Sequence, residues 1–347
     1  MIQRTAARIE ARTLDNEAPR WQEVLSRSIT RPDVLLRRLG LETHELTDGA
    51  VAGHAAFPVR VPEPFLARMR PGDADDPLLR QVLPLAAEAE PRQGFVRDPL
   101  QEADATAAPG LIRKYRSRAL LMVTGQCAVN CRYCFRRHFP YEEHRLTPQQ
   151  RESVIATLRA SPDINEIILS GGDPLSVNDR LLAQWSSALA TVPSLKRLRI
   201  HSRLPVVIPQ RVDNQLLAWI QASRLDVIMV VHINHPAEID QDVRDAMGRL
   251  KAAGVTLLNQ SVILRGVNDH PDTLQWLSEA LFAAGVLPYY LHAFDPVAGA
   301  HHFDVSDDQA RELVRDLQAR LPGYLVPRLV REVPDRPGKT LLDVGME

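Results

Sequence analysis

The sequence predicts an α/β protein whose core is a partial, TIM-like (β/α)6 barrel, preceded by an irregular helical region. From about residue 119 onward, strand-like runs with few polar positions alternate with amphipathic helical segments. This alternation is typical of a parallel sheet covered by helices. Six such units are present, fewer than the eight of a closed barrel. The chain has 347 residues, 45% of them hydrophobic, which is enough to bury a substantial core.

The strand–helix units follow one another without a long interruption. In the helical segments, apolar residues recur every three or four positions, as Val243, Met247 and Leu250 do in a segment that ends at Gly254. The predicted strands cover residues 119–125, 166–172, 197–202, 226–233, 255–264 and 287–294, and a last strand is expected within 324–333. The predicted helices cover residues 148–160, 179–191, 213–222, 240–253, 272–284 and 307–321.

The N-terminal region is rich in Pro, Ala and Arg and has no such alternation. Short helices are expected at 21–28 and 34–39, and Gly40 provides a C-cap for the second of them. Several prolines interrupt the region after that point. We therefore expect an irregular helical cap over residues 1–110, the barrel over 111–333 and a short C-terminal segment over 334–347.

Composition excludes several classes of function. The net charge is −1, so nothing in the overall charge favours a polyanionic partner such as nucleic acid. The N-terminal residues contain no apolar core of a secretory signal, and the most apolar stretch, residues 225–233, is too short to span a bilayer. We expect a cytoplasmic protein that binds neither nucleic acid nor membrane.

The cysteines form one tight motif. The chain has three, Cys127, Cys131 and Cys134, in a C-x3-C-x2-C spacing directly after the first predicted strand. An odd number within so few residues is a poor disulfide framework, and in a cytoplasmic protein it indicates a metal site. Iron–sulfur cubanes normally take four thiolates. Three thiols would leave one iron open to a small molecule. The alternative is a structural zinc with His138 as fourth ligand.

A glycine-containing turn follows the second predicted strand, with the sequence Ser170-Gly171-Gly172-Asp173-Pro174. Two consecutive glycines allow the backbone to approach a ligand closely. In barrels with parallel strands, ligands bind where the strands end, and this turn lies at such a point. The alternative is an ordinary turn without a ligand.

Together the two motifs resemble those of the radical S-adenosylmethionine superfamily. The resemblance implies that Cys127, Cys131 and Cys134 hold a four-iron, four-sulfur (4Fe-4S) cluster whose open iron chelates S-adenosylmethionine. It also implies that one electron cleaves this cofactor to methionine and a 5′-deoxyadenosyl radical. Gly171, Gly172 and Asp173 match the part of the site that binds the amino group of S-adenosylmethionine.

Within that superfamily the chain resembles the lysine 2,3-aminomutases. The resemblance implies an isomerase that converts (S)-α-lysine to (R)-β-lysine and that also uses pyridoxal 5′-phosphate. It extends from about residue 76 to residue 340 and is carried by ordered segments at 76–84, 111–141, 201–211, 261–269 and 289–303.

The resemblance also assigns residues to pyridoxal phosphate. Lys339, in the segment Pro337-Gly338-Lys339-Thr340, matches the lysine that binds this cofactor covalently, while Lys114, Tyr115 and Arg118 match the contacts to its phosphate. Lys114 replaces an arginine of the family, so it supplies charge without a bidentate fork. A nucleotide-binding P-loop is the alternative for the GKT sequence, but Val333 stands where that motif needs a glycine.

Three further residues match contacts to the substrate. Arg136 matches the arginine that pairs with the α-carboxylate of lysine, for which a guanidinium fork is suited. Asp295 and Glu332 match the two anions at the ammonium end, although clostridial-type enzymes have Asp at the position of Glu332. Glutamate as substrate would be disfavoured by two carboxylates at this end.

The short form of the chain suggests one branch of the family. It ends at Glu347 without a further cysteine, and with the Glu at 332 it resembles the bacterial aminomutase that supplies (R)-β-lysine for elongation factor P. The resemblance implies a functional link to a separate ligase that modifies elongation factor P, and a reductant of the flavodoxin or ferredoxin type. The alternatives are a 2,3-aminomutase for another amino acid, such as glutamate, a radical enzyme that modifies RNA, and a zinc-binding interaction protein.

Overall fold

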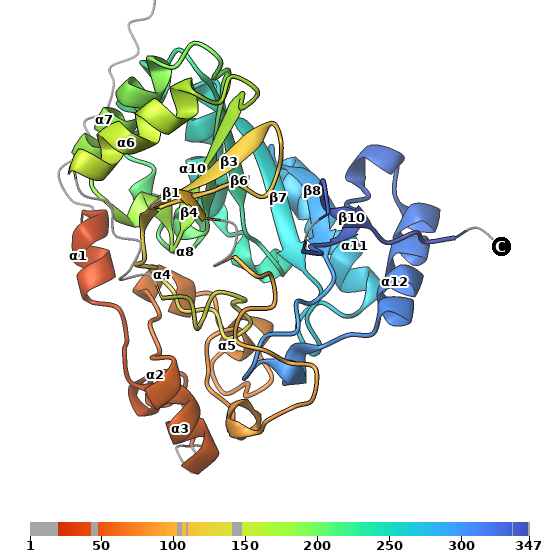
Figure 1. Ribbon diagram of the computed structural model, residues 1–347. Coiled ribbons are helices and arrows are strands. Elements are labelled where there is room, and N and C mark those ends of the chain that lie inside the picture. The colour runs from red at the N-terminus through yellow and green to blue at the C-terminus, as the bar shows by residue number, and fades with distance from the viewer. Residues whose placement is uncertain are drawn as a thin grey trace, which may run out of the picture.

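A computed structural model describes residues 20–42, 48–102, 106–108, 110–140, 148–334 and 336–345. These residues form one mixed sheet of ten strands, ordered β1 to β10 as they follow in the chain (Figure 1). The sheet has two free edges and does not close on itself, because β1 and β10 lie at opposite ends of this order. The predicted α/β fold with an open, partial barrel is therefore confirmed.

Seven neighbouring strands of the sheet are parallel. The predicted strands between residues 119 and 294 are all present, with ends within two residues of those expected. The seventh, β9, lies within the expected segment 324–333. The parallel strands are β3 (Arg118–Thr124), β4 (Glu166–Gly171), β5 (Arg197–Ser202), β6 (Asp226–Val231), β7 (Thr256–Val262), β8 (Leu287–His292) and β9 (Arg328–Arg331).

Helices connect the parallel strands, and each predicted one is present within two residues of its expected ends. Several begin where a short polar side chain accepts a hydrogen bond from the first turn: Asn178 from the Leu181 amide, Asp240 from the Val243 amide. These helices are α6 (Pro148–Arg159), α7 (Asp179–Ala190), α9 (Asn214–Gln221), α10 (Gln241–Ala252), α11 (Pro271–Ala283) and α12 (Asp307–Arg320), with a short α8 (Leu204–Val207) before α9.

Short antiparallel strands extend the sheet at both ends, and the sequence did not predict them. On one side β1 (Thr106–Ala108) pairs with β2 (Leu111–Ile112), which pairs with β3. On the other side β10 (Thr340–Leu341) pairs with β9. Strands of two or three residues carry no periodicity that a sequence pattern could reveal. β10 matters for the site because it fixes the segment that contains Lys339 against the sheet.

The N-terminal helices lie beneath the barrel in the view of Figure 1. The two helices that the sequence predicted are present, and Gly40 ends the second with φ +68°. Their apolar side chains share one core with the barrel strands, as Leu35 and Phe65 do with Leu121. The domain division at residue 110 stays a prediction. The helices are α1 (Trp21–Ser26), α2 (Pro32–Arg38), α3 (Asp48–Ala56), α4 (Glu63–Leu66) and α5 (Pro77–Arg80).

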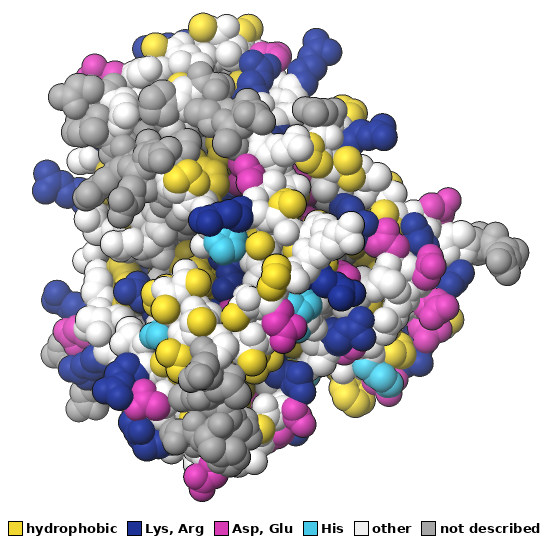
Figure 2. Space-filling model, turned by 60° about the horizontal axis from the view of Figure 1, so that its bottom comes forward, with side chains coloured by type: hydrophobic (Ala, Val, Ile, Leu, Met, Phe, Trp, Pro, Cys, Tyr) yellow, Lys and Arg dark blue, Asp and Glu magenta, His cyan; other side chains and the backbone are white. Residues whose placement is uncertain are grey.

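The face that carries these N-terminal helices shows basic and acidic side chains interspersed (Figure 2). Among the described residues, no helix combines the length and the apolar character needed to cross a membrane.

A buried ion cluster joins the N-terminal region to the cysteine loop. Glu88 lies in the 3-10 helix Ala86–Ala89, and its carboxylate accepts hydrogen bonds from Arg132 Nε at 2.8 Å and Arg137 Nη2 at 2.7 Å. The side chains of Glu88 and Arg132 are fully buried. Burial alone would raise the pKa of Glu88, but the two arginines lower it below its ordinary value. The cysteine loop is thereby held against the N-terminal region by charge.

Replacing Glu88 with Gln should lower the free energy of unfolding by about 3 to 5 kcal/mol, because two buried guanidinium groups would lose their carboxylate. Urea denaturation followed by circular dichroism measures this change. The matched control is Glu90→Gln at an exposed position two residues away, which should stay within about 0.5 kcal/mol of the wild type. Equal losses in the two variants would contradict the role given to Glu88.

Candidate active site

One cavity of about 500 Å³ lies where the parallel strands end. All of the predicted site residues line it: the three cysteines, the Gly171–Asp173 turn, the residues assigned to pyridoxal phosphate and those assigned to the substrate. Because the carboxyl ends of parallel strands meet at one edge of a sheet, loops far apart in sequence converge there. The structure therefore brings these residues together, while the roles assigned to them stay predictions.

The cysteine loop follows β3 and is anchored at several points. Arg60 Nη1 donates to the Cys127 carbonyl at 3.0 Å, and Arg203 Nη1 lies 2.8 Å from Cys131 Sγ. Burial, together with the neighbouring Cys131 sulfur, raises the pKa of Cys134 to about 11. All three cysteines thus line the cavity, and the buried Arg203 lies beside Cys131.

The glycine turn fits closely against the cysteine loop. Gly171 has φ +113°, and a Cβ on Gly172 would lie 2.4 Å from the Gln126 carbonyl oxygen, so both positions require glycine. The Asp173 carboxylate accepts hydrogen bonds from Ser202 Oγ at 2.7 Å and from the Arg203 amide at 2.8 Å. Burial raises its pKa. Asp173 therefore also ties β4 to the loop after β5, a role that the sequence did not suggest.

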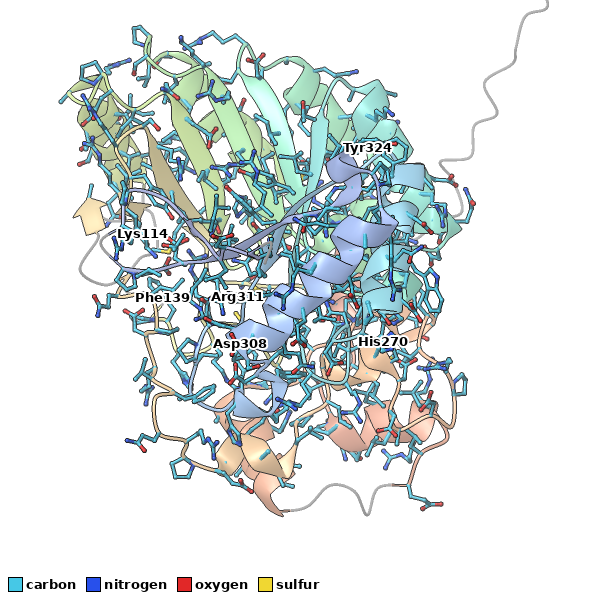
Figure 3. All side chains as sticks on the ribbon, turned by 90° about the vertical axis from the view of Figure 1, so that its right-hand side faces the viewer. Lys114, Phe139, His270, Asp308, Arg311 and Tyr324 are labelled. Atoms are coloured by element: carbon cyan, nitrogen blue, oxygen red, sulfur yellow. The ribbon has the colours of Figure 1, made fainter. Side chains whose placement is uncertain are left out.

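The residues assigned to pyridoxal phosphate converge from two chain segments. Lys339 directly precedes β10, and its Nζ donates to Glu332 Oε2 at 2.8 Å. Tyr115, before β3, donates its hydroxyl to the other oxygen of Glu332, and the Arg118 guanidinium lies 3.9 Å from the centre of the Tyr115 ring. In Figure 3 the C-terminal segment crosses toward Lys114 at the sheet edge, and Lys114 Nζ lies 3.9 Å from Glu332.

The two acidic residues assigned to the substrate have different surroundings. Glu332 is already paired with Lys339 and Tyr115, which lower its pKa against the effect of burial. Burial raises the pKa of Asp295 to about 6, and the nearby negative charge of Glu332 acts in the same direction. Within the described residues the Asp295 carboxylate accepts no hydrogen bond. It lines the cavity as a largely desolvated carboxyl group.

Arg136 faces the cavity, but its guanidinium is held by the protein. Nε and Nη2 donate to the two oxygens of Glu102 at 2.6 and 2.8 Å, and Nη1 donates to Ser170 Oγ at 3.0 Å. Sequence reasoning missed Glu102. No local signal marks it, because its partners are distant in sequence and it lies in a segment without periodicity.

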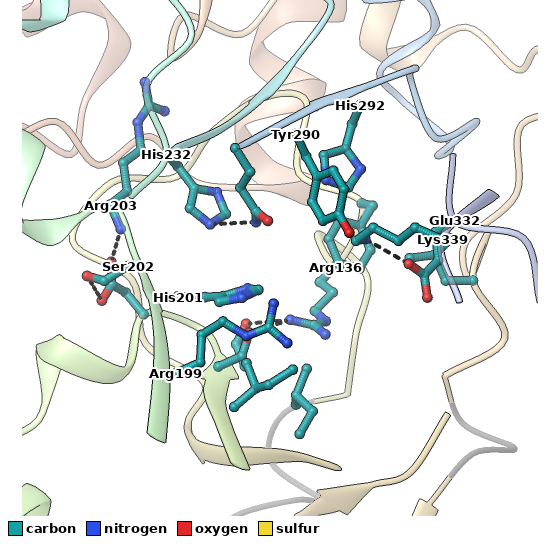
Figure 4. Close-up of a pocket in the computed structure, with 18 of the residues that line it drawn as sticks. Arg136, Arg199, His201, Ser202, Arg203, His232, Tyr290, His292, Glu332 and Lys339 are labelled. Carbon is teal, nitrogen blue, oxygen red and sulfur yellow. Dashed lines mark hydrogen bonds and ion pairs between the residues drawn. The ribbon is translucent and has the colours of Figure 1, made fainter. Parts of the chain in front are cut away.

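Three histidines of the cavity wall were also missed. His201 and His292 end strands β5 and β8, His232 follows β6, and all are buried enough to lower their pKa, to about 3 for His232. They are therefore neutral near pH 7. His232 Nε2 lies 2.8 Å from Gln260, and His201 lies in the centre of the group (Figure 4). Their position at strand ends is the signal that could have identified them.

Comparison with known proteins agrees with this geometry. The family model of the radical SAM superfamily matches residues 121–277. The L-lysine 2,3-aminomutase of Escherichia coli (strain K12) is 49% identical over 94% of this chain and 95% of its own length. That of Haemophilus influenzae is 46% identical over 94% and 96%. That of Clostridium subterminale is 36% identical over 80% of this chain and 66% of its own length.

The chain belongs to the lysine 2,3-aminomutase family. Enzymes of this family use a 4Fe-4S cluster, S-adenosylmethionine and pyridoxal phosphate. The structure allows a test of whether the residues present fit these groups.

The donor set of the lysine 2,3-aminomutase loop fits an iron–sulfur cluster better than zinc. Among the described residues, no three His, Cys, Asp or Glu side chains converge on a point where a single metal ion could bind. Zinc needs such convergence, whereas each cysteine of a cubane binds a different iron. His138, the fourth ligand of the zinc alternative, does not line the cavity and lies 3.0 Å from the Ala298 carbonyl. The zinc alternative is therefore not supported.

The pyridoxal phosphate residues of the family also fit their group. A lysine amine for covalent attachment lies on the wall of the cavity, which a second lysine, a tyrosine hydroxyl and an arginine also line. These are groups that can bind a phosphate dianion. Lys339, Lys114, Tyr115 and Arg118 supply these groups.

Replacing Gly172 with Ala should lower the free energy of unfolding by about 2 to 3 kcal/mol, because the methyl group would overlap the Gln126 carbonyl. The matched control is Gly248→Ala in α10, where nothing lies within 4 Å of the added Cβ. There the substitution should raise stability by up to about 1 kcal/mol, since alanine favours helix. Urea denaturation measures both, and a Gly172→Ala variant as stable as Gly248→Ala would refute the close approach.

Proposed function

We propose that this protein is an L-lysine 2,3-aminomutase, an isomerase that uses radical S-adenosylmethionine chemistry and pyridoxal phosphate to convert (S)-α-lysine to (R)-β-lysine. One observation carries the proposal most directly. A three-thiol loop, a lysine amine, an arginine and two carboxylates all line a single cavity. This is the set of groups that a cluster, a covalently bound aldehyde cofactor and a diamino acid would each need.

When bound, the cluster with S-adenosylmethionine would supply a primary-carbon radical, and pyridoxal phosphate would supply the carbonyl that carries the migrating amino group. The chain's own residues bind and orient. Arg136 would pair with the α-carboxylate of the substrate, and Lys339 would hold the pyridoxal cofactor. Because these groups line the same cavity, they would hold the reacting carbon near the radical source.

Several further residues would complete the binding. Lys114, Tyr115 and Arg118 would bind the phosphate of the pyridoxal cofactor, and Cys127, Cys131 and Cys134 would hold the cluster. Gly171, Gly172 and Asp173 would form part of the S-adenosylmethionine site. The closeness of the Gly172 backbone to the cysteine loop supports this assignment.

The charges at the far end of the cavity favour lysine over glutamate. Asp295 and Glu332 would present two negative charges to the terminal group of the substrate. These carboxylates attract the ammonium of lysine and repel the carboxylate of glutamate. Asp295 is the better placed of the two, because Glu332 already has Lys339 as a partner.

We also propose two partners outside the chain. A reductant protein of the flavodoxin or ferredoxin type would deliver the electron that the radical chemistry needs. The product, (R)-β-lysine, would serve a ligase that modifies elongation factor P. The support for this branch is the resemblance in the cysteine loop and the Glu at position 332. The direct test is whether deletion of the gene removes β-lysyl modification from elongation factor P.

Anaerobic incubation of the protein with lysine, S-adenosylmethionine, pyridoxal phosphate and dithionite tests the activity itself. Chiral chromatography should show (R)-β-lysine, and the same mixture with glutamate should give no β-amino acid. Failure to convert lysine with a reconstituted cluster, or a preference for glutamate, would overturn the proposal.

Cys131→Ala should abolish formation of 5′-deoxyadenosine, because two remaining thiols would not hold the cluster. The products are measured by liquid chromatography after anaerobic reconstitution with iron and sulfide. Thr157→Ser, in α6 and outside the cavity, is a control that should keep full activity. Retained cleavage of S-adenosylmethionine by Cys131→Ala would rule out the cluster assignment.

The affinity for lysine should depend on pH through Asp295. Its pKa of about 6 means that the carboxyl is ionised above pH 6 and neutral below it. The ammonium of the substrate binds the ionised form, so KM for lysine should rise as the pH falls through about 6. Asp295→Asn should raise KM by about tenfold at pH 8, the loss of one charge-assisted hydrogen bond, and remove this pH dependence.

Steady-state kinetics between pH 5.5 and 8.5 measure both effects. Asp308→Asn on the exposed face of α12 is the matched control and should leave KM and its pH profile unchanged. A pH profile of Asp295→Asn identical to that of the wild type would show that another group is responsible.

A further inference from the structure

Glu102 is a buried carboxylate that pairs with two cationic side chains, and each of these is proposed to bind a different ligand. It holds Arg136 by two hydrogen bonds of 2.6 and 2.8 Å, and its Oε1 lies 3.1 Å from Lys114 Nζ. Arg136 is assigned to the carboxylate of the substrate and Lys114 to the phosphate of the cofactor. One side chain therefore connects the two anion-binding positions of the cavity.

Glu102 is buried, and it stays ionised near neutral pH. Only 3% of its side chain is exposed. Burial alone would raise its pKa, but the charges and hydrogen bonds of Arg136 and Lys114 lower it to about 2. The group is thus a carboxylate at neutral pH.

The backbone before Glu102 supports a specific placement of this side chain. Gln101 has φ +50°, and among the described residues it is the one residue other than glycine in the left-handed region. The Glu102 amide donates to Asp98 Oδ1 at 3.2 Å and closes the turn. An unfavourable backbone conformation persists when the surrounding structure requires it, and such positions concentrate at functional sites. Here the turn directs the carboxylate inward, while Gln101 itself is exposed.

We propose that Glu102 is a positioning residue that sets Arg136 and Lys114 for binding of the substrate carboxylate and the cofactor phosphate. This inference rests on the proposed function. Glu102 accepts hydrogen bonds from Nε and Nη2 of Arg136, and Ser170 Oγ accepts one from Nη1. The plane of the guanidinium is therefore fixed before the substrate binds. An arginine that is already ordered loses less conformational entropy on binding than a mobile one.

The opposite effect, competition between Glu102 and the incoming anions, is weaker in this geometry. Arg136 and Lys114 are largely buried, with 9% and 19% of their side chains exposed. Without the carboxylate between them, the two cations would repel each other in a region that water does not screen. They would separate, and both anion-binding positions would be lost together. Removal of Glu102 should therefore weaken binding of both ligands.

Two variants of the full-length protein test this proposal. Glu102→Gln removes the charge and nearly keeps the shape, whereas Glu102→Asp keeps the charge but is too short to span both cations. The dissociation constant of pyridoxal phosphate is measured by absorbance titration without lysine or S-adenosylmethionine. KM and kcat for lysine are measured in the complete anaerobic assay. Glu90→Gln, at an exposed position, is the matched control.

Glu102→Gln should raise both the dissociation constant of pyridoxal phosphate and KM for lysine by about tenfold or more, equivalent to losing a charge-assisted hydrogen bond at each position. KM should rise by a larger factor than kcat falls. Glu102→Asp should recover part of both losses. If Glu102→Gln does not fold, Glu102→Asp by itself should still raise the dissociation constant of pyridoxal phosphate and KM for lysine, each by less than tenfold.

Unchanged or improved binding of both ligands in Glu102→Gln would overturn the proposal, because it would identify Glu102 as a competitor or a bystander. A loss of stability in urea with both binding constants unchanged would also overturn it. Failure of the wild type to convert lysine, together with weakened binding of pyridoxal phosphate in Glu102→Gln, would reject the proposed function while supporting the positioning of Lys114.

Discussion

Parallel pairing of strands β3 to β9 is the constraint on which the rest of this structure depends. It places the carboxyl ends of seven strands at one edge of the sheet, so that every loop leaving this edge can reach the same volume. The cysteine loop, the glycine turn, the buried histidines and Asp295 all leave the sheet there. The short strand β10 extends this principle to the C-terminal segment, because its pairing with β9 holds Lys339 beside Glu332.

The cavity walls are built from charges that share partners. Glu88 forms ion pairs with Arg132 and Arg137, and Glu102 forms ion pairs with Arg136 and Lys114. Glu238 pairs with Arg203, which also donates a hydrogen bond to Cys131. A buried charge without a partner is costly, so each of these groups is confined to a narrow range of positions. The consequence is a site whose cations are held in place by protein carboxylates before any ligand binds. Asp295 differs from these carboxylates, since burial raises its pKa to about 6.

Prediction from the sequence succeeded where the physical cause was local. The strands and helices from 118 to 320 follow from hydrophobic periodicity and from short polar side chains at helix starts, which act within a few residues. The cysteine spacing and the paired glycines are equally local, and resemblance to a family added the residues assigned to pyridoxal phosphate and to the substrate. Strands β1, β2 and β10 were missed because two or three residues form no period. Glu102 was missed because both of its partners lie outside its own segment.

The amino-acid sequence by itself determined the (β/α)6 core and the three-thiol motif, since both depend on residue type and spacing along the chain. The other candidate site residues came from resemblance to a family. Only the tertiary structure decided how the charges pair. In the structure Arg136 pairs with Glu102, and Glu332 pairs with Lys339 and Tyr115. The sequence had suggested that Arg136 and Glu332 each bind one end of the substrate. The physical reason is that electrostatic partners in a desolvated cavity are chosen by distance in space, and a linear pattern carries no information about that distance.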